Sequence, residues 1–373
     1  MAALRLDLGV IRSHTIRMKL TIQLQVVPDS DQAAELLDTM AHFNAAASFA
    51  AAVGFEAKVS SQPSIHKRCY AELRERFGLS AQMAVRAIGK AVEAFKSLES
   101  KDEAICPEFH PRGAVAYDER ILSFKGLDKV SLRTLKGRMV LPLIYGEYQG
   151  RRFDRIQGQV DLVYRGGKFF LYATVEVPEE APIEPKDWLG VDLGIVNLAT
   201  DSDGEDFSGE RVEKVRRKYH GRRKGLNRKR TKSARRRLCK IRRREANFRR
   251  DENHRISKAI VARAKATGRG IVLEDLEGIT GRVSVRREQR ARLKGWAFDQ
   301  LRRFIEYKAR LAGVPVLYVD PADTSRTCAE CGHCEKANRR SRDHFECRHC
   351  GHSDRADANA ARNIRAKGRS QAA

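Results

Sequence analysis

The chain has 373 residues, and its 73 Lys and Arg against 48 Asp and Glu give a formal net charge of +25. This excess predicts a polyanionic partner, with nucleic acid ahead of a membrane surface, although a merely solvated basic surface is the simpler alternative. No stretch reaches the about 18 consecutive apolar residues of a spanning helix, and residues 1–17 hold no apolar signal segment. We therefore expect a cytoplasmic protein with no membrane partner and with room for two or three domains.

The N-terminal part of the chain begins as a strand and continues as helices. Apolar and polar side chains alternate over residues 20–26, which predicts a half-buried strand. Asp29 and Asp31 offer N-cap chemistry for a helix reaching about residue 52, and apolar spacing predicts further helices over 65–77 and 81–98. Together they predict a helical module over residues 29–104.

After Pro107, short β-prone segments separated by turn residues replace the helices. Strands are predicted over residues 114–117, 121–124, 129–132, 139–144, 159–164 and 168–177. Regularly spaced strands of this kind are typical of a small barrel or sandwich. We expect a β-barrel domain over residues 1–28 and 105–185, with the helical module as its insertion and a proline-rich linker at its end.

From residue 187 onward, strands alternate with helices, which predicts an α/β layer fold. In the stretch Leu189–Ala199, alternation places Gly190, Asp192 and Gly194 on one face of a strand, so the acid stands on a face cleared of bulk. A turn with a short return strand near 205–208 is expected next. Helices over 256–266 and 296–312 and strands over 271–273 and 314–319 are then predicted.

A strongly basic helical run covers residues 211–250. About half of its residues are Lys or Arg, and Glu213 and Glu245 are its two acids. Since so little acid compensates this charge, a clamp on a phosphate backbone is favoured over a solvated basic helix. The candidate nucleic-acid-binding residues are Arg216, Arg217, Arg222, Arg223, Arg228, Arg235, Arg236, Arg242 and Arg243.

Five of the eight cysteines lie between residues 328 and 350. Cys328 and Cys331 form one CxxC pair and Cys347 and Cys350 another, and each pair is followed by Gly-His. This spacing predicts a structural tetrahedral zinc site in a ribbon over residues 326–352, rather than free cysteines in a loop. Spare donors in the same stretch are His333, Cys334, His344, His349 and His352.

Three carboxylates stand at positions from which they can converge on a divalent metal. They are Asp192, Glu274 at the end of an apolar run, and Asp357 in Asp-Ala-Asn-Ala-Ala-Arg-Asn. An acid at a strand end is by itself more often a cap or a surface charge, so the prediction depends on the combination. Asp354 is a rival for the third position, and Asp275 is expected to be structural because it faces away from Glu274.

The sequence also resembles a known family. The matching segments are Gly190-Val-Asp-Leu-Gly, Val272-Leu-Glu-Asp-Leu, Thr324-Ser-Arg-Thr-Cys-Ala-Glu-Cys-Gly, Phe345-Glu-Cys-Arg-His-Cys-Gly and Asp357-Ala-Asn-Ala-Ala-Arg-Asn-Ile. In order and spacing they resemble the TnpB (OrfB) family of insertion-sequence-encoded RuvC-type nucleases, relatives of the type V CRISPR effectors. The likeness is strong over residues 189–364 and weaker from residue 18, where it rests on the order of strands and helices.

This resemblance implies an RNA-guided DNA endonuclease associated with a transposable element. It implies a multidomain α+β chain whose RuvC (RNase H-like) nuclease domain, residues 186–325 and 353–373, is interrupted by the zinc ribbon. Asp192, Glu274 and Asp357 match the family's catalytic acids and would bind Mg²⁺, with two ions in the site. The implied partners are a guide RNA and double-stranded target DNA, and the N-terminal barrel and helical module would grip the RNA and read a short target-adjacent motif.

Two other functions remain open at this point. One is a nuclease-inactive RNA-guided DNA-binding regulator of the same fold, which would not need the three acids. The other is an unguided transposase or DNA nuclease, which would need no stable RNA partner. A monomer with its RNA is expected, and a dimer stays open.

Overall fold

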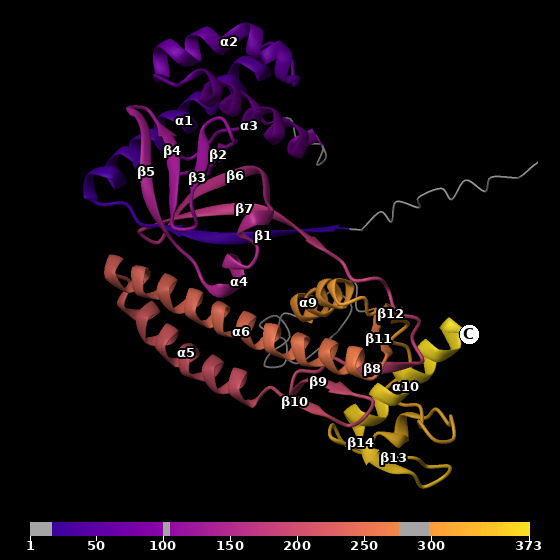
Figure 1. The fold of residues 1–373 in the computed structure, drawn as a ribbon. Helices are drawn as coiled ribbons and strands as arrows, with labels where there is room; N and C mark the ends of the chain where they lie inside the picture. The colour runs from indigo at the N-terminus through magenta and orange to yellow at the C-terminus, as the bar shows by residue number, and fades with distance from the viewer. Residues whose placement is uncertain (1–16, 100–104, 276–297) are drawn as a thin grey trace, which may run out of the picture. The chain divides into compact units, whose positions relative to one another are not determined.

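The computed structural model describes residues 17–99, 105–275 and 298–373. The chain forms two compact units, Met1–Pro178 (unit 1) and Glu179–Ala373 (unit 2). Each unit is described by itself below, and Figure 1 shows the elements of both. Among the helices of the described ranges, none is long and apolar enough to cross a membrane.

Unit 1 contains a seven-stranded sheet in the order β2-β6-β7-β1-β5-β4-β3. All of its pairings are antiparallel, and it curves into a nearly closed barrel, as predicted. The long β1 pairs with β7 along its whole length, from Arg17 opposite Pro178 to Val26 opposite Phe169. The strands are β1 (Arg17–Val26), β2 (Val115–Tyr117), β3 (Leu122–Lys125), β4 (Lys129–Thr134), β5 (Gly137–Ile144), β6 (Ile156–Arg165) and β7 (Lys168–Pro178).

Three helices lie in the chain between β1 and β2, where the helical module was expected. They are α1 (Ser30–Glu56), α2 (Gln62–Phe77) and α3 (Ala81–Glu99). The predicted cap of the first helix is present as a capping box, in which the Asp29 side chain accepts from the Gln32 N–H and the Gln32 side chain accepts from the Asp29 N–H. The short α4 (Glu147–Gly150) and η1 (Phe153–Arg155) connect β5 to β6.

Unit 2 is built on a five-stranded sheet in the order β10-β9-β8-β11-β12. Its strands are β8 (Asp187–Asp192), β9 (Asn197–Asp201), β10 (Asp206–Ser208), β11 (Arg269–Glu274) and β12 (Val316–Val319). β8, β11 and β12 are parallel, whereas β9 and β10 are antiparallel to their neighbours. The expected return strand near 205–208 is confirmed as β10, which pairs with β9. The chain also reverses after Asp192, so that β9 pairs with β8 and the first strand ends at Asp192.

Helices cover both faces of this sheet (Figure 1). On one face Leu189, Val191, Ile271 and Leu273 form a core with residues of α6 (Lys232–Ala266) and α9 (Phe298–Leu311). On the other face Trp188 and Val272 pack against Ile364 of α10 (Ala356–Ala372). The alternation of side chains along the strands, as predicted from the sequence, thus assigns residues correctly to the two faces of the sheet.

The basic run forms two helices, α5 (Glu210–Lys229) and α6. The separate helix predicted over 256–266 is the end of α6, which continues unbroken because Leu238, Ile241, Ile256 and Ile260 are buried along its length. Of the helix predicted over 296–312, α9 confirms residues 298–311, and residues 296–297 lie outside the described residues.

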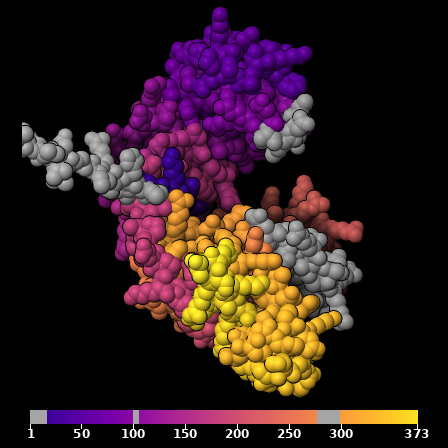
Figure 2. All heavy atoms as spheres, turned by 90° about the vertical axis from the view of Figure 1, so that its right-hand side faces the viewer, coloured from indigo at the N-terminus to yellow at the C-terminus, as the bar shows by residue number. Residues whose placement is uncertain are grey.

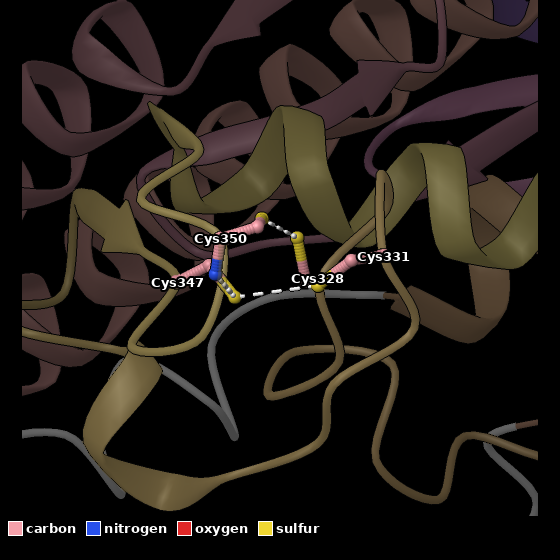
Figure 3. Close-up of side chains that lie close together, drawn as sticks. All are labelled: Cys328, Cys331, Cys347 and Cys350. Carbon is pink, nitrogen blue, oxygen red and sulfur yellow. Dashed lines mark hydrogen bonds between the residues drawn. The ribbon is translucent and has the colours of Figure 1, made fainter.

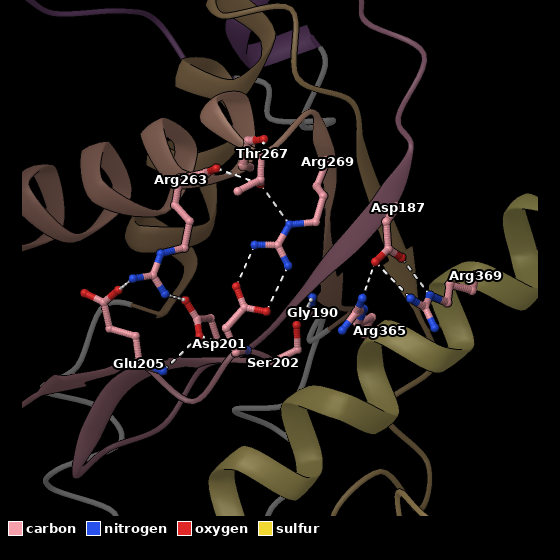
Figure 4. A network of polar contacts seen from close by, with 12 residues as sticks. Asp187, Gly190, Asp201, Ser202, Glu205, Arg263, Thr267, Arg269, Arg365 and Arg369 are labelled. Atoms are coloured by element: carbon pink, nitrogen blue, oxygen red, sulfur yellow. Dashed lines mark hydrogen bonds and ion pairs between the residues drawn. The ribbon is translucent and has the colours of Figure 1, made fainter.

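Ion pairs hold α10 at the end of β8 remote from Asp192 and hold the β9–β10 hairpin to α6 (Figure 4). Arg369 donates to both oxygens of Asp187 at 2.7 and 2.8 Å, and Arg365 also contacts this carboxylate. Arg263 of α6 donates to the buried Asp201 at 2.7 Å. The hydrogen bonds from Arg369 and Arg365 hold the pKa of Asp187 well below its usual range, so this anchor is ionised at neutral pH.

Candidate active site and metal centre

Asp192 and Glu274 end two neighbouring parallel strands. Val272 pairs with Gly190 and Leu273 with Val191, so the next step of the register sets Glu274 beside Asp192. Both acids share the face of Gly190 and Val272, because side chains two residues apart point the same way. The carboxyl ends of parallel strands are where open α/β sheets present their functional groups.

Asp357 comes to the same place from α10, where it stands in the first helical turn. A glycine makes this approach possible: a Cβ at Gly190 would meet the Ala361 carbonyl oxygen at 2.1 Å and the Arg365 nitrogen at 2.6 Å. Ala361 is one helical turn from Asp357, and Gly190 is two residues from Asp192 on the same strand face. The close contact of helix and strand therefore brings these two carboxylates together.

The three acids influence one another electrostatically. Burial, together with the carboxylates of Glu274 and Asp357, raises the pKa of Asp192 to about 8. Burial also raises the pKa of Glu274. All three side chains keep partial exposure to solvent. Arg339 and Lys367 act against these rises without cancelling them. A solvent-accessible cluster of like charges is a site where a divalent ion stabilises the ionised form.

Three polar side chains support this cluster, and the sequence did not single them out for the role. The Thr324 hydroxyl donates to Glu274 Oε1 at 2.5 Å, Asn197 Nδ2 donates to Asp357 Oδ2 at 3.1 Å, and Arg339 lies 4.0 Å from Asp357 Oδ1. Thr324 lies in one of the segments that resemble the family, and this resemblance is the signal that could have identified it. Nothing local marks Asn197, because its contact joins residues 160 positions apart.

Asp354, the rival for the third position, and Asp275, which is expected to be structural, have other partners. Asp354 forms an ion pair with Arg362 at 2.8 Å. Asp275 pairs with Arg302 of α9 at 3.2 Å, on the face of the sheet opposite the cluster. Neither is among the groups that shift the pKa of Asp192. Asp357 therefore remains the third candidate.

The four predicted cysteines form one compact cluster (Figure 3). Their sulfur atoms all lie within 4.8 Å of one another, with 3.7 Å between Cys328 and Cys350 and 3.6 Å between Cys331 and Cys347. Four thiolates at about 2.3 Å from a tetrahedral zinc lie about 3.8 Å apart. The donor set and its spacing therefore fit a zinc ion.

The two halves of the cysteine cluster repeat the same backbone turn. Gly332 donates its N–H to the Cys328 carbonyl at 3.0 Å, and Gly351 donates to the Cys347 carbonyl at 3.1 Å. Both glycines have positive φ, +73° and +76°, which other residues rarely adopt. This is the tight turn that the glycine after each CxxC pair predicts.

The cysteine cluster packs against the start of α10. Cys328, Cys347 and Phe345 share a small core with Ala356, the residue before Asp357. The hairpin of β13 (His344–Glu346) and β14 (Ser353–Arg355) leads directly into the helix. Figure 2 shows the helix (yellow) and the cysteine-bearing residues (orange) beside each other on one face.

The nine candidate arginines of α5 and α6 fall into two groups. Arg216 and Arg217 donate to Glu213 at 2.7 and 2.8 Å, and Arg223 contacts Glu245, so these three neutralise the two acids of the run. The remaining six are exposed along the helices: Arg222, Arg228, Arg235, Arg236, Arg242 and Arg243.

Known protein families and individual proteins resemble this chain in sequence. A family model described as "Probable transposase" matches residues 172–277, and one described as "Cas12f1-like, TNB domain" matches residues 298–364. The protein named "Putative RNA-guided DNA endonuclease InsQ" of Escherichia coli (strain K12) is 32% identical over 300 residues, which cover 74% of this chain and 71% of that protein. The chain belongs to the TnpB (OrfB) family.

Further relatives of this TnpB-family chain are CRISPR-associated. A protein of Sulfoacidibacillus thermotolerans named "CRISPR-associated endodeoxyribonuclease Cas12f1" is 32% identical over 245 residues, which span 60% of this chain and 54% of that relative. Among solved structures, a Cas12f1-sgRNA-target DNA complex matches with a TM-score of 0.64 over 93% of this chain and 98% of that one, at 14% identity. This last likeness shows a shared fold.

Proposed function

We propose that this chain is an RNA-guided DNA endonuclease that hydrolyses target DNA next to a short target-adjacent motif. The observation that carries the proposal is the meeting of Asp192, Glu274 and Asp357 at one edge of the unit 2 sheet, in a chain whose family relative bears that activity in its name. In this reading residues 186–325 and 353–373 form a RuvC-like nuclease domain. A binder without nuclease activity gains nothing from three mutually repelling acids.

Asp192, Glu274 and Asp357 would hold Mg²⁺, since carboxylate oxygens are its preferred protein ligands. Bound Mg²⁺ supplies an activated water and stabilises the leaving oxygen of a phosphodiester. The chain's own part is to fix the carboxylates. β8 and β11 set two of them side by side, α10 supplies the third, and Asn197 and Thr324 restrict two of their side chains.

The zinc ion that fits the four cysteines would be structural. Four thiolates close a tetrahedral site and leave no position for a substrate. Its place beside Ala356 supports a role in holding the start of α10, and thus Asp357, against the sheet.

The exposed arginines of α5 and α6 would contact the phosphates of the guide RNA or of its duplex with the target. In unit 1, a groove of about 700 Å³ between α3 and strands β3 and β6 is the proposed reader of the target-adjacent motif. Arg86, Arg120 and Gln159 line it and offer the donors and acceptors that recognise base edges. Arg86→Ala should change the adjacent sequences that permit cutting, and an unchanged preference would contradict this assignment.

The function is tested by sequencing the RNA that co-purifies with the protein, expressed with its native flanking DNA and washed at high salt. One discrete species with a constant scaffold and a variable end is expected, and it should direct cutting to DNA that matches the variable end. Random host RNA or none, with cutting that ignores the RNA, would favour the unguided transposase or nuclease. Discrete RNA and tight target binding without cutting would favour the regulator.

A further inference from the structure

Residues 324–329, here called the connecting segment, touch both clusters of unit 2. Its first residue, Thr324, contacts Glu274, and its fifth, Cys328, is a member of the cysteine cluster. Thr324 is 3% exposed and Cys328 is 1% exposed. The segment thus connects a carboxylate to a thiol over a few residues, and Thr324 and Cys328 are both buried.

The contact of Thr324 with Glu274 has a defined direction. The Thr324 hydroxyl oxygen lies 2.5 Å from Glu274 Oε1 and 3.1 Å from the Pro321 carbonyl oxygen. Both of these oxygens are acceptors, and the shorter contact assigns the single hydroxyl proton to Glu274. A distance of about 2.5–2.7 Å is typical of a hydroxyl that donates to a charged oxygen. Burial raises the pKa of Glu274, and this hydrogen bond acts against that rise.

Two asparagines of α10 hold the connecting segment in place. Asn363 Nδ2 donates to the carbonyl oxygens of Thr324 and Thr327 at 2.8 and 2.7 Å. Asn359 Nδ2 donates to the Thr327 carbonyl at 2.8 Å, and its Oδ1 accepts from the Ala329 N–H at 3.0 Å. Both asparagines are buried and stand one turn apart on the helix that carries Asp357. The segment cannot shift without leaving buried polar groups unpaired.

We propose that Thr324 is a positioning residue, which fixes the Glu274 carboxylate through its hydroxyl and is itself fixed by Asn363 and the cysteine cluster. The inference rests on the proposed function, since it assigns Glu274 to a divalent metal. A carboxylate held at Oε1 presents Oε2 in one orientation, and side chains that orient a metal ligand typically change metal affinity about 10- to 100-fold when removed. The same hydrogen bonds connect an intact cysteine cluster to the geometry of the acids.

The test is the affinity of the purified full-length chain, stripped of nucleic acid at high salt, for Mn²⁺, followed by electron paramagnetic resonance. Thr324→Val keeps the shape of the side chain and removes the hydroxyl, and it should weaken Mn²⁺ binding about tenfold or more. Thr324→Ser restores the hydroxyl and should bind like the wild type. Thr327→Val is the matched control, because its hydroxyl bonds to the Asp323 carbonyl at 2.9 Å and belongs to the same segment.

Wild-type affinity in Thr324→Val, or equal losses in Thr324→Val and Thr324→Ser, would overturn the inference. Zinc content is measured for every variant, and Thr324→Ala replaces Thr324→Val if the latter loses zinc. Glu274→Gln distinguishes a failure of the metal-site assignment from a failure of the positioning role of Thr324. If it binds Mn²⁺ and cuts DNA as the wild type does, the assignment of Glu274 to the metal site fails; if it loses both while Thr324→Val does not, the positioning role alone fails.

Discussion

The cysteine cluster and the carboxylate cluster of unit 2 both lie near the start of α10, yet they are assembled in opposite ways. The cysteines come from 23 consecutive positions, 328–350, and two repeated backbone turns suffice to aim their sulfur atoms. The acids come from β8, β11 and α10, from Asp192 to Asp357 along the chain. A cluster of residues that are close in the sequence depends on its own turns. A cluster of residues that are far apart in the sequence depends on every interaction that sets strand register and helix position.

The largest effect is expected from breaking the local cluster. Cys347→Ser removes one thiolate, and since zinc binding contributes on the order of 10 kcal/mol in small zinc modules, unit 2 should lose several kcal/mol of unfolding free energy and its zinc. Denaturant unfolding and metal analysis measure both. Cys239→Ser, on the exposed surface of α6, is the control. A Cys347→Ser chain that keeps zinc and wild-type stability would show that Cys347 is not a zinc ligand.

The distant cluster can be broken without touching an acid. Gly190→Ala places a methyl group against the backbone of α10, where it would meet the Ala361 oxygen at 2.1 Å, so overpacking should cost about 3 kcal/mol and lower Mn²⁺ affinity together with cutting.

The matched control for that substitution is Gly221→Ala in α5, where an added Cβ meets nothing within 4 Å. Since alanine is the better helix former by about 1 kcal/mol, this variant should be as stable as the wild type or more so. Equal behaviour of the two variants would contradict the close packing that brings Asp357 to Asp192.

The basic helices α5 and α6 are a third region to compare. Substitutions of their exposed arginines are expected to affect RNA binding alone. Replacing Arg228, Arg235, Arg236 and Arg242 by Gln should reduce the salt dependence of RNA binding, with a slope smaller by about 0.7 for each phosphate that is no longer neutralised. Arg216→Gln with Arg217→Gln is the control, because both side chains already pair with Glu213. If the two sets change the slope equally for each arginine replaced, pairing with Glu213 does not keep an arginine from binding RNA.

The sequence predicts local features better than features that depend on contacts between distant residues. The CxxC spacing and its glycines are local, and the structure assembles the four cysteines as expected. Strand alternation correctly put Gly190 and Asp192 on one face. The reversal after Asp192 was missed, because β9 is recognisable only from its pairing with β8. Asn197 and Thr324 were missed for the same reason, since their partners are 160 and 50 residues away.

The central claim is that Asp192 belongs to a metal-holding site used for cutting and not for recognition. The direct test is Asp192→Asn, which keeps the side-chain shape, measured for guide-directed cutting and for target binding in parallel. Cutting should fall by on the order of 10³-fold or more, the scale for losing an essential electrostatic group, while target affinity stays at the wild-type value. Cutting at the wild-type rate would contradict the assignment, and equal loss of binding would show that Asp192 serves the fold instead.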